Sequence, residues 1–280
     1  MATRKPARSN LVAPRFQASA FPELETLNGT DTVQSLDRLT DGKVEKMTLI
    51  VCCAAMAMLR QVASPILWLD TQGNVLVQGR EYVPIVTPGV TANHTSKGVV
   101  YDFSGNRGGI LFGDPDALKL SGSMTISSWI YLRSYANNGA QAQILFRGDD
   151  RNGLDPYCLA AEADGTMNFT INNAQGQGMG VKTEVPLNQW LHVLASFNDQ
   201  TGELAMWVNG EKTAFARTAK HPFTNLQPQF TPGVGVGNVQ NNHGPHNQPL
   251  NGMIADLRLY TSALTPEDVS WFAPGTSKQP

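Results

Sequence analysis

The sequence predicts an all-β protein, a sandwich of two antiparallel sheets with an extended N-terminal arm and short helices. From Ser123 to Leu264, runs of alternating β-branched, aromatic and polar residues recur, and turn-forming residues separate them. This alternation is typical of strands with one buried face, and its recurrence favours a sandwich over alternating strands and helices. The dipeptides Asp164-Gly165 and Asn209-Gly210 favour tight hairpin turns.

Composition and charge narrow the class of protein. The 280 residues are enough to bury a full core, and 21 basic against 23 acidic residues leave a net charge of −2. A chain with this charge has no basic field that would make nucleic acid its primary ligand. Cys52, Cys53 and Cys158 are odd in number and two are adjacent, so we expect reduced thiols. The first ten residues lack the apolar core of a signal peptide, and we therefore expect no signal peptide.

The chain divides into a basic extended arm (1–30), a helical segment (31–63), the sandwich (64–274) and a tail (275–280). No acidic residue precedes Glu23 in the arm. A disordered tail and an arm that becomes ordered on a partner subunit are both open interpretations. The basic side chains that would make the subunit contacts are Arg4, Lys5, Arg8 and Arg15.

The helical segment contains an unusual apolar stretch. Asp31 can cap a short helix that ends at Asp41-Gly42, and residues 43–62 can form a second helix. From Met47 to Leu59 this second helix is apolar on nearly all sides, so it must be covered all round. It is too short for a bilayer, which needs about 20 residues, so we expect no membrane partner. It packs against the sandwich or between subunits through side chains that include Leu49, Ile50, Met56 and Leu59.

The predicted strands follow Pro65, which ends the helical segment. A long strand from Ser123 to Leu132 is expected to be central, because its apolar and polar residues alternate. Thr265 can cap a short helix that has Pro266 in its first turn. The other predicted strands cover residues 66–70, 74–77, 82–86, 98–103, 109–112, 144–146, 190–197 and 250–260, in addition to the two hairpins.

Four stretches together resemble the laminin G-like branch of the concanavalin A-like lectin/glucanase jelly rolls. The resemblance extends from Ile66 to Phe272 and implies a two-sheet jelly roll, often with one concave sheet, that meets ligands with that sheet or with its edge loops. The fold alone does not name a ligand, because it hosts enzymes, lectins and structural modules. The four stretches are Ser127-Ser128-Trp129-Ile130, Gln189-Trp190-Leu191-His192-Val193, Trp207-Val208-Asn209-Gly210-Glu211 and 252–260 followed by 263–267.

The residues for glycoside hydrolysis are incomplete. Retaining hydrolases with a related jelly-roll fold place two or three carboxylates at alternating positions of one strand, about 5 Å apart. Here the nearest candidates are Glu162 and Asp164, without a third acid, and Asp164 belongs to a predicted turn. The sequence therefore predicts a protein that is not an enzyme and has no catalytic residues.

A calcium ion is the one cofactor that the resemblance leaves open. Asp102 and Asp256 fall at positions similar to those of calcium-binding relatives. Calcium takes six to eight oxygen ligands, whereas the sequence offers only these two side chains and loop carbonyls near Gly105 and Asn106. The preferred interpretation is that both are hydrogen-bonded aspartates at strand ends, and that the protein has no cofactor.

Two polar loops are candidates for ligand or partner contacts. Both combine carboxylates, amides or imidazoles with glycine, and either a sugar's hydroxyls or a neighbouring subunit's backbone would suit them. A histidine pair without a third ligand is weak support for zinc. The candidate residues are Asp149, Asp150, Arg151 and Asn152 in the first loop, and Asn241, Asn242, His243 and His246 in the second.

Three classes of function fit these observations, and we rank a structural or interaction protein of a larger assembly first. The missing signal peptide, the reduced thiols, the basic arm and the apolar segment resemble a bacteriophage virion component, such as a capsid decoration, collar or tail protein. We then expect a homo-oligomer that is made in the host cytoplasm and resides in the virion. A module that binds cell-surface or polymeric glycans is the alternative, and a glycoside hydrolase-like enzyme is third. The alternative needs a surface aromatic platform, whereas core or strand positions account for Trp68, Trp129, Trp190 and Trp207, and Trp271 is a poor candidate.

Deleting residues 1–62 is expected to leave a sandwich that no longer assembles, because the arm and the apolar segment are the predicted tether. Light scattering on the full chain and on the 63–280 fragment measures this. An oligomer for the full chain and a monomer for the fragment is the expected result. A fragment that assembles like the full chain would show that the arm is not the tether.

Overall fold

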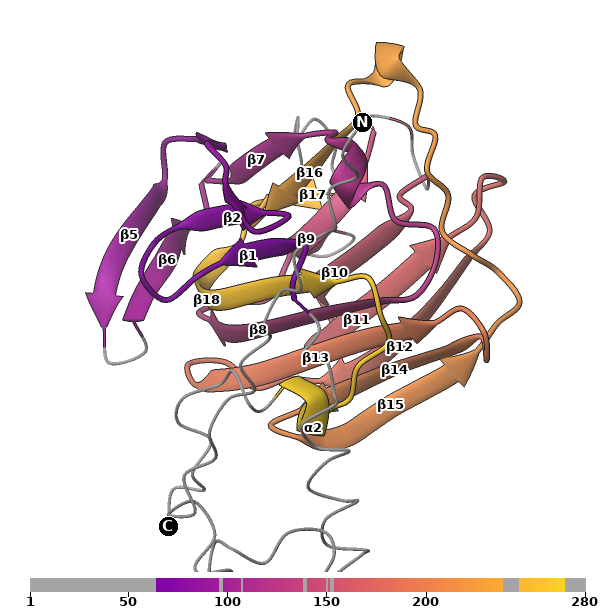
Figure 1. Ribbon diagram of the computed structural model, residues 1–280. Coiled ribbons are helices and arrows are strands. Elements are labelled where there is room, and N and C mark those ends of the chain that lie inside the picture. The colour runs from indigo at the N-terminus through magenta and orange to yellow at the C-terminus, as the bar shows by residue number, and fades with distance from the viewer. Residues whose placement is uncertain are drawn as a thin grey trace, which may run out of the picture. The chain divides into compact units, whose positions relative to one another are not determined.

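Two β-sheets carry most of the regular structure in the computed structural model (Figure 1). The structure describes residues 64–269 except 96–97, 107, 138–139, 150, 152–153 and 239–246, together with the backbone but not the side chain of Asn247. The predicted all-β, two-sheet sandwich is confirmed. No helix among the described residues is long and apolar enough to cross a membrane.

The first sheet has ten strands in the described part of the chain, and all its pairs are antiparallel. Its order is β15-β14-β13-β8-β18-β1-β2-β3, and β6, which pairs with β18, carries β5 on its other side. The predicted long strand is β8, and it is central as expected. The bounds are β1 Leu67–Leu69, β2 Val75–Val77, β3 Arg80–Glu81, β5 Val90–Thr95, β6 Gly98–Ser104, β8 Met124–Leu132, β13 Trp190–Asn198, β14 Glu203–Val208, β15 Glu211–Arg217 and β18 Asn251–Tyr260.

The second sheet has eight strands in the same described ranges, in the order β12-β11-β10-β9-β16-β7-β4, with β17 beside β9. The short β17–β9 pair is parallel, and the others are antiparallel. The bounds are β4 Ile85–Val86, β7 Ile110–Gly113, β9 Gln141–Gly148, β10 Tyr157–Glu162, β11 Thr166–Asn172, β12 Gly178–Glu184, β16 Gly233–Val236 and β17 Asn247–Gln248. Short helical turns η4 (Asp116–Leu118), η5 (Pro228–Phe230) and α2 (Pro266–Val269) complete the described structure.

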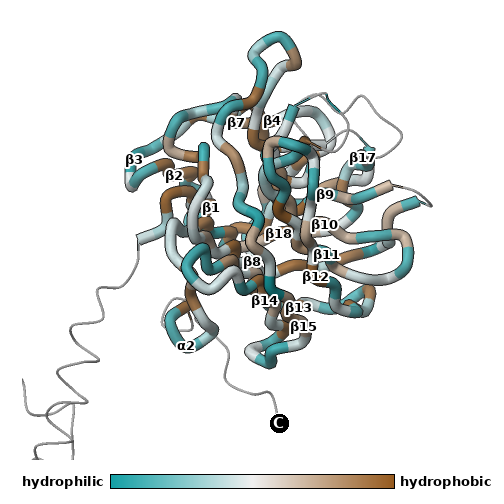
Figure 2. Tube along the Cα trace, turned by 90° about the vertical axis from the view of Figure 1, so that its right-hand side faces the viewer, coloured by the Kyte–Doolittle hydropathy of each residue, from teal (hydrophilic) through white to brown (hydrophobic). Residues whose placement is uncertain are grey.

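One apolar core lies between the two sheets. Alternate residues of β8, from Met124 to Leu132, join it, and so do Leu191, Val193 and Phe197 of β13 and Phe169 of β11. Figure 2 shows hydrophobic segments along the strands and hydrophilic ones in many turns. The alternation that predicted strands from sequence thus also selects the residues that are buried.

The predicted turns and the predicted helix are present. Asn209 and Gly210 have φ of 52° and 87°, the left-handed values that a tight hairpin needs at both central residues. Gly165 likewise has φ of 87° at the hairpin between β10 and β11. Thr265 donates its backbone N–H and its hydroxyl to the carboxylate of Asp268, 2.9 and 3.0 Å away, at the start of α2.

Alanine substitutions at two glycines, Gly237 and Gly210, test the contact between the two sheets. Gly237, which follows β16, has φ of 73°, and a β-carbon there would lie 2.1 Å from the ring of Phe103 in the first sheet. Gly210 has a similar left-handed φ of 87°, but nothing lies within 4 Å of its β-carbon position. Gly237→Ala is expected to lower the free energy of unfolding by several kcal/mol, and Gly210→Ala by about 1–2 kcal/mol from backbone strain alone. Chemical denaturation measures both, and equal losses would contradict the contact.

Candidate functional site

Aromatic side chains gather on the face of the first sheet that is turned away from the core, here called the outer face. Most are half-buried and none belongs to the main core cluster. Alternation along β8 explains this position, because Met124, Ile126 and Ile130 point into the core and the residues between them point outward. The half-buried aromatic residues of this face are Trp68, Trp129, Tyr131, Trp190 and Trp207, and Phe215 of β15 lies exposed on the same face.

Four of the outer-face residues form one continuous line across the strands. Trp190, Tyr131, Met253 and Asp102 stand directly opposite one another on β13, β8, β18 and β6. Residues directly opposite in antiparallel strands share a face, and a strand spacing of about 4.8 Å makes the line about 15 Å long. The ring centroids of Tyr131 and Trp190 lie 5.7 Å apart with their planes tilted by 59°. We call these four residues the cross-strand row.

A fixed ion pair ends the row. Arg133, which follows β8, donates from both terminal nitrogens to the two carboxylate oxygens of Asp102 at 2.8 and 2.6 Å. This hydrogen bonding raises the pKa of the Arg133 guanidinium. The side chains are 34% and 26% exposed, so solvent reaches both. The row therefore combines apolar ring surface with polar groups whose orientation is set before a ligand arrives.

A group of residues around Trp129 packs in the middle of the outer face, next to the cross-strand row. The Trp129 ring lies 5.4 Å from the imidazole of His192, and the Ser127 hydroxyl lies 3.0 Å from His192 Nε2. Asn209 accepts the backbone N–H of His192 at 2.9 Å. Because Ser127 and His192 are both buried, this group holds Trp129 in place and is not itself a contact surface.

A bulge in β18 organises the side of the outer face next to β1. Asp256 has φ of 50°, and the strand register shifts between Ala255 and Arg258. Its carboxylate accepts hydrogen bonds from Trp68 Nε1 at 2.8 Å and from Arg258 at 2.9 and 2.8 Å. The Arg258 guanidinium also lies 5.0 Å from the centroid of the Trp68 ring. Burial raises the pKa of Asp256, and Arg258 and Trp68 oppose this shift.

The two aspartates of the calcium hypothesis are thus both bonded to arginine. Asp102 lies on β6 and Asp256 in the bulge of β18, as hydrogen-bonded strand residues. The described ranges contain no group of three or more His, Cys, Asp or Glu side chains placed to hold a metal ion. Hydrogen-bonded aspartates were the preferred interpretation of the sequence, and calcium binding stays the alternative to it.

The first predicted contact loop is described only in part. Asp149 is buried and accepts hydrogen bonds from the backbone and the guanidinium of Arg151, at 3.1 and 3.0 Å, and from the backbone of Gln227 at 3.3 Å. Asp149 therefore stabilises its own loop. The other predicted residues lie outside the described residues: Asp150, Asn152, Asn241, Asn242, His243, His246, Arg4, Lys5, Arg8, Arg15, Leu49, Ile50, Met56, Leu59 and Trp271.

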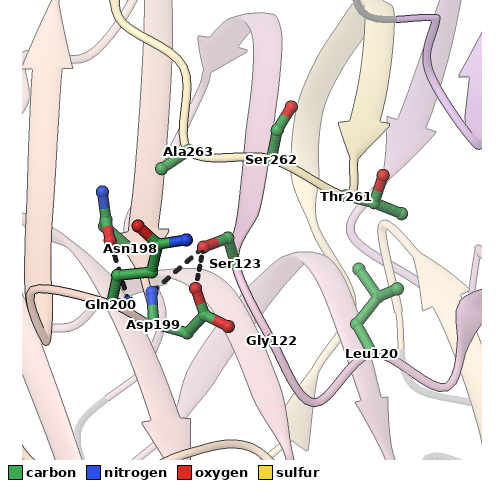
Figure 3. A pocket seen from close by; sticks show the side chains of 9 residues that line it. All are labelled: Leu120, Gly122, Ser123, Asn198, Asp199, Gln200, Thr261, Ser262 and Ala263. Carbon is green, nitrogen blue, oxygen red and sulfur yellow. Dashed lines mark hydrogen bonds between the residues drawn. The ribbon is translucent and has the colours of Figure 1, made fainter.

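A pocket of about 510 Å³ lies where β8 begins and where β13 and β18 end (Figure 3). Three chain segments meet there because Phe197 pairs with Met124 and Tyr260 pairs with Thr125. We call it the end pocket. It is lined by Leu120, Gly122, Ser123, Asn198, Asp199, Gln200, Thr261, Ser262 and Ala263.

The sequence and fold now identify the family. The profile described as Laminin_G_3, Concanavalin A-like lectin/glucanases superfamily, matches residues 104–270. The chain belongs to this superfamily. No curated protein sequence matches the chain.

Solved structures of other proteins share this fold. The binding domain of botulinum neurotoxin DC in complex with SialylT superposes with a TM-score of 0.57 at 14% identity, covering 77% of this chain and 52% of that chain. The binding domain of Paraclostridial Mosquitocidal Protein 1 gives 0.55 at 16%, covering 75% and 51%. Domain 4 of AbnA, a GH43 extracellular arabinanase from Geobacillus stearothermophilus, in complex with arabinotriose, gives 0.57 at 17%, covering 76% and 100%. The present chain covers about half the length of each of the two toxin binding domains and the full length of the arabinanase domain.

One feature of the sequence indicates the cross-strand row. All four strand tryptophans were assigned to core or strand positions, and they do lie in strands. However, the alternation of β8 already places Trp129 and Tyr131 opposite to the core residues. An aromatic residue on the polar phase of a strand therefore indicates an outward aromatic surface.

Asp155 next to the Asp149 loop makes stability depend on pH. Burial, and then the charge of Asp149, raise the pKa of Asp155 to about 7. The folded protein then holds a proton that the unfolded chain releases near pH 4, so stability falls as pH rises from about 4 to about 7, by about 1.4 kcal/mol per unit of pKa shift. Asp155→Asn is expected to remove this decline.

Thermal unfolding midpoints at pH 5 and pH 8 measure the effect. Asp164→Asn is the matched control, because Asp164 is exposed and its pKa is lowered by its hydrogen bonds to Thr166. This control should keep the wild-type decline. The assignment to Asp155 is wrong if Asp155→Asn keeps it too.

Proposed function

We propose that the protein is a non-catalytic carbohydrate-binding module that contacts glycans with the cross-strand row. The half-exposed rings of Tyr131 and Trp190 beside the fixed Arg133–Asp102 pair carry this proposal. A sugar ring has apolar C–H faces and hydroxyl edges, so it needs apolar ring surface and oriented polar groups within one short span. Aromatic residues with a few convergent polar groups are the usual composition of small-ligand sites.

The structural relatives support a glycan as the ligand class. One relative is a neurotoxin binding domain in complex with SialylT, and another is an arabinanase domain in complex with arabinotriose. Their identity to this chain is low, so they support the choice of class and not a particular sugar. The arabinanase domain is a closer guide to size, because the chain covers its full length.

The carboxylates that resembled hydrolase residues support a non-catalytic function. Glu162 Oε1 accepts hydrogen bonds from Gln141 at 2.7 Å and from Asn168 at 2.8 Å. Lys182 Nζ lies 3.8 Å from Glu162 Oε1 and 3.5 Å from Asp164 Oδ2. Hydrogen bonds to Thr166 lower the pKa of Asp164, whereas a general acid needs a raised one.

The charge of the row favours a neutral glycan. Arg133 and Asp102 neutralise each other, and the remaining members of the row are uncharged. A line of about 15 Å suits a short stretch of a longer chain better than a single sugar. We therefore expect a neutral oligosaccharide or polymer.

This proposal reverses the order of functions inferred from the sequence. The assembly function rests on residues 1–63, which lie outside the described part of the chain. A virion location and oligomerisation through the arm stay predictions, tested by the deletion of residues 1–62. Glycan binding by the sandwich is compatible with either outcome of that deletion.

Replacing Trp190 by Ala is expected to weaken glycan binding at least tenfold, because truncating an aromatic anchor commonly costs about 1.4 kcal/mol or more. Phe215→Ala is the matched control, since Phe215 is a 68% exposed aromatic residue on β15, outside the row. A glycan array with the full chain selects the ligand, and titration calorimetry measures the dissociation constants.

If Trp190→Ala binds the glycan as tightly as the wild type and has the same unfolding midpoint, the cross-strand row does not contact the glycan. An array without any hit for the wild type would overturn the function itself. Tyr131→Ala provides the second variant in the event that Trp190→Ala does not fold.

A further inference from the structure

The carboxylate of the end pocket is held in one orientation. Ser123 Oγ donates to Asp199 Oδ1 at 2.5 Å, and the backbone N–H of Asp199 donates to Ser123 Oγ at 3.0 Å. Figure 3 shows this pair with the Asp199 carboxylate between Ser123 and Gly122. Because one carboxylate oxygen and the serine hydroxyl are used in this contact, the carboxylate needs no reorganisation to accept a ligand.

The second carboxylate oxygen, Asp199 Oδ2, lies close to Gly122, and both residues line the pocket. A β-carbon on Gly122 would lie 3.1 Å from Asp199 Oδ2, and its other contact within 4 Å would be the carboxylate carbon of Asp199. No described residue donates a hydrogen bond to Oδ2. The missing side chain at position 122 thus leaves this oxygen accessible from the pocket.

The remaining lining is neutral and rich in hydrogen-bonding groups. Asn198 uses its Oδ1 to accept the backbone N–H groups of Gln200 and Thr201, both at 3.0 Å. Thr125 donates to the carbonyl of Ser262 at 2.7 Å and fixes that wall. Asp199 is the one charged residue among the nine that line the pocket. The lining therefore offers a single negative charge surrounded by amide and hydroxyl groups.

We propose that the end pocket is a second binding site, which takes an amino-sugar unit with its protonated amine on Asp199 Oδ2. The amine satisfies the accessible carboxylate oxygen, and the sugar hydroxyls meet the amide and hydroxyl groups of the lining. The volume of about 510 Å³ lies within the range of small-molecule sites, about 300–1,000 Å³. The glycan nature of this ligand rests on the proposed function, whereas the preference for an amine rests on the pocket alone.

The contribution of the ion pair sets how much more tightly an amino sugar should bind than a neutral sugar. A partly exposed ion pair contributes little, so glucosamine is expected to bind a few-fold more tightly than glucose, roughly threefold, at low salt. Added salt should reduce this difference, because exposed charges are screened over about 10 Å at 0.1 M ionic strength. N-acetylation removes the charge and should bring the affinity to that of glucose.

Binding of glucosamine, glucose and N-acetylglucosamine to the full chain is measured by titration with NMR detection of protein shifts. Asp199→Asn keeps the shape of the side chain and removes its charge, so it should abolish the preference for glucosamine. Gly122→Ala places a methyl group against Oδ2 and should weaken glucosamine binding while leaving the charge. Phe215→Ala, on β15 and outside both the row and the end pocket, should change neither result.

Two outcomes overturn the inference. Equal affinities for glucosamine and glucose would exclude an amine site, and a glucosamine preference that persists in Asp199→Asn would place it elsewhere. In both cases neutral oligosaccharide binding that depends on Trp190 would leave the proposed function intact. Conversely, glucosamine binding that depends on Asp199, without any oligosaccharide bound at the row, would support the end pocket and contradict the row.

Discussion

The antiparallel register between β8 and its neighbours is the constraint on which both faces of the first sheet depend. Val193 opposite Ser128 and Trp190 opposite Tyr131 set which side chains enter the core and which line the outer face. Because side chains alternate, a slip of one residue would exchange the two faces of the slipped strand, moving apolar residues into water and aromatic ones into the core. The burial of the apolar core therefore also maintains the register that aligns the cross-strand row, although no member of the row belongs to the main core cluster.

Two kinds of local chemistry complete these surfaces. At the row, Arg133 and Asp102 satisfy each other, so the polar groups stay in place at little cost in unpaired charge. At the end pocket, Ser123 uses one oxygen of Asp199 and leaves the other accessible. The first arrangement suits contact with a neutral surface, and the second retains a charge. One strand, β8, thus leads from one type of recognition surface to the other.

The elements that could be predicted from sequence are those with a clear local pattern, such as alternation or a turn dipeptide, and strands without such a pattern were missed. The alternation of β8 and the turns at Asn209-Gly210 and Asp164-Gly165 are local properties, and the structure confirms them. The strands β5, β12 and β16 were not predicted, because their polar or glycine-rich sequences have low strand propensity and gain their partners only in the folded sheet. The cross-strand row and the end pocket could not be predicted for the same reason, because their contacts form only in the folded sheet. Asp102 meets Met253, and Ser123 meets Asp199, only through a register that joins distant parts of the chain.

The length of β8 sets the distance between the two proposed sites, and so the size of a ligand that could reach both. Tyr131 and Ser123 lie eight residues apart at opposite ends of this extended segment, so about 27 Å of nearly rigid backbone separates the row from the end pocket. A ligand that reaches both must be a polymer, and its second contact then forms at a raised effective concentration. A free sugar gains nothing from this arrangement. On the two proposals, the rigid spacing would select for chain length through avidity and not through the strength of either contact.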